Sequence, residues 1–210
     1  MVASCGLGLL IGMRHAMEPD HLAAVSTLVA DRPRPYRASL LGAFWGIGHS
    51  LSLLGAGALL LATRAQMPPR WANGFELVVA VVLVALGVRS LRIVRTKPAA
   101  RDERRHVGGG PLSLAARPLV VGVAHGLAGT GAITALALAT VPSPGAAMIW
   151  MAAFAAGSVL GMALISGAAG IPLERISRQP KAQAALLGAV GALSLAVGVC
   201  WGAVAIGRLL

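Results

Sequence analysis

Charged side chains are scarce in this sequence. Only 12% of its 210 residues are Asp, Glu, Lys or Arg, whereas a soluble domain carries about 25%. Hydrophobic residues make up 57%, and the mean hydropathy is +0.78. This composition excludes an ordinary soluble domain. It predicts an all-α fold, a polytopic bundle of transmembrane helices with the lipid bilayer as its surroundings.

Acidic residues and cysteines are scarcer still. The 7 acids face 18 basic residues, but the basic ones collect in short segments between apolar runs, where they act as topology signals and not as a nucleic-acid surface. Cys5 and Cys200 lie at opposite ends and form no CxxC pair, which excludes a thiolate metal site or redox pair of that type. No basic segment precedes the first apolar run, so no cleaved signal peptide is expected. Neither a nucleophile–base pair nor a cofactor fingerprint is found, so the sequence predicts neither an enzyme nor a cofactor.

Six apolar stretches are long enough to cross ~30 Å of hydrocarbon. They lie at 2–30, 38–62, 73–91, 118–140, 146–170 and 184–208. The connections between them alternate between strongly basic and nearly uncharged. Under the positive-inside rule, this alternation predicts that both termini lie outside a bacterial-type cell (inner) membrane.

The two halves of the chain resemble copies of each other. We expect a first three-helix half at 1–95, a cytoplasmic linker at 96–117 and a second half at 118–210. Since three spans per half invert the second copy, the pattern predicts a 3+3 inverted-topology repeat with the substrate at the midplane. Three pairs align at an offset of 110 residues: Gly12 with Gly122, His15 with His125, and Phe44 with Phe154.

Ionisable residues within the first expected span form a His-x4-Asp-His pattern of His15, Asp20 and His21. Such groups are costly inside a bilayer and mark functional sites by default. On a straight helix these side chains would point in different directions. Pro19 cannot donate to the His15 carbonyl, so we expect the helix to break there, leaving that carbonyl free and letting the side chains converge.

His49 lies at the predicted midpoint of the second span, at the same depth as His15. The shared depth predicts one metal site, with His15, Asp20, His21 and His49 as ligands. Imidazole and carboxylate ligands without thiolate suit Ni, Co, Zn or Cu(II). The expected substrate pathway adds four further residues: Glu18, Ser50, His125 and Thr130.

These elements resemble the nickel/cobalt transporter (NiCoT) superfamily, and most closely its short bacterial branch of nickel permeases and urease-accessory-type membrane proteins. The first family signature, Arg-His-Ala-x-Asp-Ala-Asp-His, is matched at Arg14 to Ala16 and at Asp20 and His21, with Glu18 and Pro19 replacing Asp-Ala. The second, Gly-His-Ser, is matched at 48–50. The resemblance implies a secondary carrier whose substrate is Ni²⁺ or Co²⁺.

Other interpretations remain open from the sequence. The histidines and Asp20 could be an internal hydrogen-bonded cluster, and Glu18 could pair with Arg14 four residues before it. His125 and Thr130 could serve helix packing alone. Alternatives to a Ni or Co carrier are Ni or Co efflux, a membrane scaffold for nickel-enzyme maturation, or proton-coupled transport of a small organic solute.

Overall fold

The computed structural model of the chain describes residues 2–30, 34–95, 111–177 and 179–210. Within these ranges the backbone forms seven α-helices. Six of them begin at a proline, which suits the first helical position because its N–H would have no partner there and its φ is already helical. The helices are α1 (Val2–His15), α2 (Pro19–Ala30), α3 (Pro35–Thr63), α4 (Pro69–Arg95), α5 (Pro111–Thr140), α6 (Pro144–Ser177) and α7 (Pro180–Leu209).

Five of the helices, α3 to α7, are each long and apolar enough to cross a membrane. They contain the last five expected spans and extend a few residues beyond them, because a helix ends at a proline or a cap and not where hydropathy falls. The chain is therefore an all-helical, multi-pass membrane protein.

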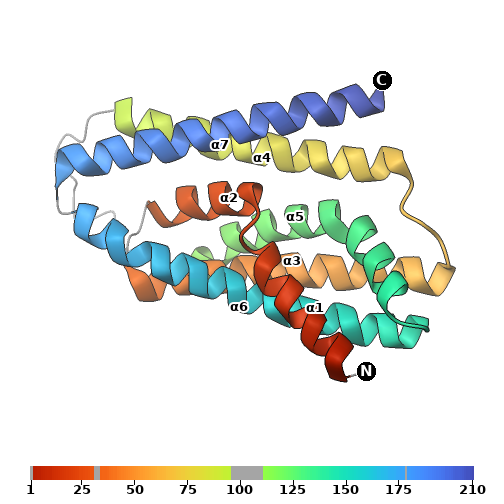
Figure 1. Cartoon of the computed structure of the whole chain (residues 1–210). Coiled ribbons are helices and arrows are strands. Elements are labelled where there is room, and N and C mark those ends of the chain that lie inside the picture. The colour runs from red at the N-terminus through yellow and green to blue at the C-terminus, as the bar shows by residue number, and fades with distance from the viewer. Residues whose placement is uncertain (1, 31–33, 96–110, 178) are drawn as a thin grey trace.

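The first expected span, 2–30, is two helices and not one. With 14 and 12 residues, neither α1 nor α2 alone can cross ~30 Å of hydrocarbon at 1.5 Å per residue. In Figure 1 α1 leads from the N-terminus to the middle of the bundle, and α2 continues from there toward the opposite side. The break that Pro19 predicts is confirmed, and it falls between His15 and Pro19.

The helices are arranged in layers (Figure 1). Helices α4 and α7 lie side by side, α3 packs along α5 and α6, α1 packs along α6, and α2 lies between these groups. Serine hydroxyls join α4 to α7: Ser90 donates to the Leu187 carbonyl and Ser194 to the Leu83 carbonyl, both at 2.9 Å. Such short polar contacts hold helices together where lipid offers no hydrophobic drive.

Glycines allow two of the closest helix approaches. A Cβ on Gly12 of α1 would collide with the backbone of Phe154 in α6, and a Cβ on Gly122 of α5 would collide with the backbone of Trp45 in α3. Only glycine permits such contact between backbones. These contacts fix α1 against α6 and α5 against α3 next to the histidines described below.

The expected linker, 96–117, lies outside the described residues as far as residue 110, and from Pro111 onward it forms the first turns of α5. Figure 1 shows both termini at one end of the bundle, together with the α3–α4 and α5–α6 connections. At the other end α2 and α4 finish and α3 and α5 begin. The helix ends that flank the basic segments therefore lie at one end of the bundle.

Candidate metal site

The site begins at the turn between α1 and α2. The Glu18 N–H donates to the His15 carbonyl at 3.0 Å, and Pro19 then starts α2. The expectation that this carbonyl is left free is wrong, because an i→i+3 bond satisfies it, as happens at many helix ends. The turn places His15 at the end of one helix and Asp20 and His21 in the first turn of the next.

Three histidines from three helices converge. The ring centroids of His15 and His21 are 4.5 Å apart, those of His15 and His49 5.1 Å, and those of His21 and His49 5.3 Å. One nitrogen of each ring lies within 4.8 Å of the corresponding nitrogens of the other two. All three side chains are buried. The structure thus brings together the three histidines of the expected ligand set, and their role as ligands stays a prediction.

The ring nitrogens of these histidines fall into two groups. Nδ1 of His15 lies 2.9 Å from a Glu18 carboxylate oxygen, and Nδ1 of His21 lies 3.0 Å from Asp20 Oδ1. Nε2 of both rings, and both nitrogens of His49, are buried without a hydrogen-bond partner among the described residues. A carboxylate on one nitrogen orients the ring and leaves the lone pair of the other available for a metal. An unsatisfied buried polar atom costs about 1–3 kcal/mol, so this arrangement favours an electron-pair acceptor at its centre.

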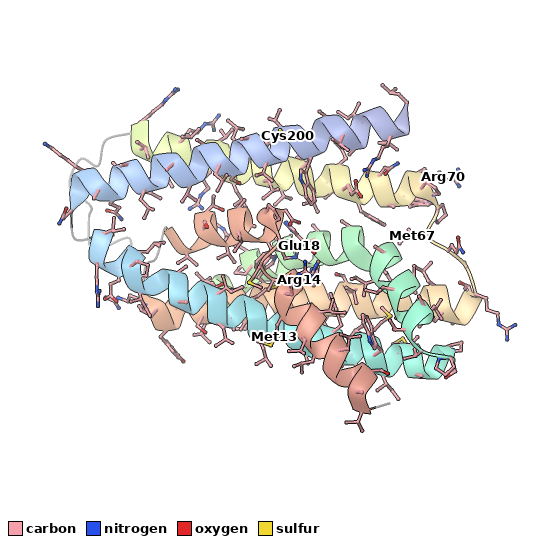
Figure 2. The ribbon with its side chains drawn as sticks, in the orientation of Figure 1. Met13, Arg14, Glu18, Met67, Arg70 and Cys200 are labelled. Atoms are coloured by element: carbon pink, nitrogen blue, oxygen red, sulfur yellow. The ribbon has the colours of Figure 1, made fainter. Side chains whose placement is uncertain are left out.

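The two carboxylates differ in exposure. Asp20 is buried at 4%, whereas the side chain of Glu18 is 49% exposed. Glu18, Asp20 and His21 form a second group whose ligand atoms lie within 4.8 Å of one another. Glu18 pairs with His15 and not with Arg14, although Figure 2 shows Arg14 and Glu18 close to the same turn. The Glu18 carboxylate is therefore part of the histidine cluster.

His125, from α5, extends the cluster. Its ring centroid lies 5.4 Å from that of His21, and the side chain is buried. Its Nδ1 donates to the Val121 carbonyl at 2.9 Å, while its Nε2 has no partner among the described residues. His125 thus has the same arrangement as His15 and His21, one nitrogen held and one unpartnered, but its nitrogens lie outside the three-histidine group.

The two hydroxyl residues of the expected pathway make packing contacts. Ser50 Oγ donates to the Ala155 carbonyl at 3.1 Å and so joins α3 to α6. Thr130 Oγ1 donates to the Gly126 carbonyl of its own helix at 2.7 Å. Each hydroxyl proton is therefore already used, and a part in the substrate pathway remains a prediction for both.

Two aromatic residues that sequence analysis did not assign to the site form its walls. The ring of Trp45 lies 5.2 Å from His21 and 5.5 Å from His125, and Phe154 lies 5.2 Å from His15. Both aromatic side chains are fully buried. Trp45 precedes His49 by four residues, a spacing that puts both on one helix face, and this was the signal available in the sequence.

No family model matches this chain, and no solved structure does. The urease accessory protein UreH of Bacillus sp. (strain TB-90) is 32% identical over 202 residues, covering 92% of this chain and 87% of that protein. This match supports the nickel/cobalt transporter type of family that the motifs resemble, and it does not distinguish among branches. The chain therefore belongs to the family of the urease accessory protein UreH.

Proposed function

We propose that this protein is a secondary carrier of Ni²⁺ or Co²⁺, which it binds as substrate at His15, Asp20, His21 and His49. The observation that carries the proposal is the convergence of buried, unpartnered ring nitrogens from His15, His21 and His49. In His15 and His21 a carboxylate holds the opposite ring nitrogen. The urease accessory name of the relative adds support, since it places that protein beside a nickel enzyme. The words "accessory protein" in the relative's name also agree with a role other than that of an enzyme.

Charge balance favours a dication at this place. Asp20 and Glu18 carry the two negative charges that offset a divalent ion away from water, and neutral imidazoles supply the remaining electron pairs. Protonation of the imidazoles would remove those electron pairs and weaken binding.

The two groups of candidate ligand atoms share His21. We infer that the ion first meets the half-exposed Glu18 with Asp20 and His21, and then passes to the buried set of His15, His21 and His49. A shared ligand lets the ion move without losing all its protein ligands at once.

The proposed carrier has six spans, with α1 and α2 together forming the first, both termini outside the inner membrane, and two inverted halves. Reciprocal glycine contacts support the repeat. Gly48 of α3 meets Leu119 of α5, just as Gly157 of α6 meets Leu9 of α1. Leu9 and Leu119, in the first span of each half, are 110 residues apart, and Gly48 and Gly157, in the second span, are 109 apart. Alternating access would then arise from movement of one half against the other.

A second candidate function is a membrane accessory that delivers nickel to an enzyme without transporting it by itself, which the relative's name favours. The direction of net transport depends on the ion gradients across the membrane. A strain lacking the protein distinguishes the two directions: reduced metal accumulation indicates uptake, and reduced metal resistance indicates efflux.

The deciding experiment uses the purified chain alone. We expect it to bind Ni²⁺ or Co²⁺ in competition with Zn²⁺ and Cu²⁺, and to move the bound metal into proteoliposomes. A His15→Ala/His21→Ala/His49→Ala triple variant, matched in helix content and insertion, gives the background. Metal binding without flux would favour the accessory role. If the chain binds none of the four metals, both the carrier and the accessory proposals are wrong.

A further inference from the structure

A cleft of about 470 Å³ opens between α2, α4 and α5, separate from the histidine cluster. Its volume falls within the ~300–1,000 Å³ of small-ligand sites. The walls are aliphatic, with Leu28 from α2, Val82 and Leu86 from α4, and Val120 from α5. Two cations, Arg89 and Arg117, also line the cleft, and its lining includes no acidic residue.

The two arginines come from neighbouring helices. Arg89 is six residues before the end of α4, and Arg117 is six residues after the start of α5. Both side chains are exposed. Arg89 has a further interaction within the protein, whereas Arg117 has no ion-pair partner within the described ranges.

We propose that this cleft binds a phospholipid with an anionic headgroup, whose phosphate pairs with Arg89 and Arg117 while an acyl chain lies along the aliphatic walls. Guanidinium groups bind phosphate in a bidentate manner, and basic pockets between transmembrane helices recognise anionic headgroups. A water-soluble anion would leave the aliphatic walls unfilled. A zwitterionic lipid would add a cation beside two arginines.

The cleft touches two of the helices that build the metal site. Leu28 belongs to the helix that carries Asp20 and His21, and Val121, whose carbonyl accepts from His125, is part of the lining. A bound lipid would therefore contact the elements that hold the cluster. The lipid site itself is independent of the proposed transport, because it rests only on the cleft and its charges.

Native mass spectrometry of the purified full chain, titrated with phosphatidylglycerol or phosphatidylcholine, tests the proposal. We expect phosphatidylglycerol to bind more tightly. Arg89→Gln and Arg117→Gln should each weaken its binding about fivefold, and together roughly thirtyfold. Arg95→Gln, on the same helix but outside the cleft, should leave it unchanged. Ala85→Phe, which fills the cleft without changing charge, should also weaken it.

Three results would overturn the proposal. One is equal phosphatidylglycerol binding in the double variant and the Arg95→Gln control, with Ala85→Phe also unchanged. Another is equal affinity for the two lipids in the unaltered chain. The third is full displacement of phosphatidylglycerol by inorganic phosphate, which would show an ion site and not a lipid site.

Discussion

Asp20 is next to His21 in the chain and also bonds to it, through one contact of 3.0 Å between a carboxylate oxygen and Nδ1. The contact is buried, so little water competes for either group. At the scale of single residues, the site therefore consists of side chains that orient one another. Substitutions at these positions distinguish the loss of a metal ligand from the loss of a charge and from a change in packing.

Removing a proposed ligand gives the most direct result. His15→Ala or His21→Ala should abolish metal flux in proteoliposomes, because losing one of three or four ligands exceeds the 10–100-fold cost typical of residues that only orient ligands. Insertion and helix content should be unchanged. His125→Ala should reduce flux less, since its nitrogens lie outside the three-histidine group. Flux close to that of the unaltered chain in either of the first two variants would favour a purely structural cluster.

Asp20→Asn tests charge separately from shape. The amide keeps an oxygen that can accept from His21 Nδ1, but the negative charge that offsets a dication is lost. We expect metal affinity, measured by calorimetry, to fall nearly as far as in Asp20→Ala. If Asp20→Asn binds metal like the unaltered chain, Asp20 serves only to orient His21.

At the scale of helices, close approach is set by where glycine occurs. Gly122→Ala should destabilise the protein by about 1–3 kcal/mol, the usual cost of overpacking, because the new Cβ would collide with the Trp45 backbone. Gly129→Ala, on the same helix but with nothing within 4 Å, is the matched control. It should be neutral or slightly stabilising, because alanine favours helix by about 1 kcal/mol over glycine.

Thermal unfolding in detergent measures both variants. A lower midpoint for Gly122→Ala and an unchanged or higher one for Gly129→Ala are expected. Equal midpoints would mean that α3 and α5 can separate without cost. Metal affinity should fall in Gly122→Ala as well, since the collision also involves the backbone of His49.

At the scale of the whole molecule, the orientation in the membrane is the main prediction. Reporter fusions after residues 66 and 142 should report the outside, and fusions within 96–110 should report the cytoplasm, because basic segments stay inside. Fusions at residues 96–110 that report the outside would reverse the topology. Fusions at 66 and 142 that disagree with each other would exclude six spans.

The class of protein and most helix limits follow from the sequence because they depend on local properties. Hydropathy over about 20 residues identifies a spanning helix, and proline marks where a helix begins. The break before α2 could be predicted for the same reason, since Pro19 acts on its own turn. The bonding within the turn could not, because the His15 carbonyl found a partner in Glu18.

Tertiary structure alone decided which groups meet. The sequence placed His15 and His49 at one depth, but depth does not fix the direction of a side chain. Glycine contacts between α1 and α6 and between α3 and α5 set the rotation of each helix, and that rotation turns Trp45 and Phe154 toward the histidines. The pairing of Glu18 with His15 instead of Arg14 arose likewise, because the turn after α1 ends the regular helical spacing on which the four-residue pairing depends.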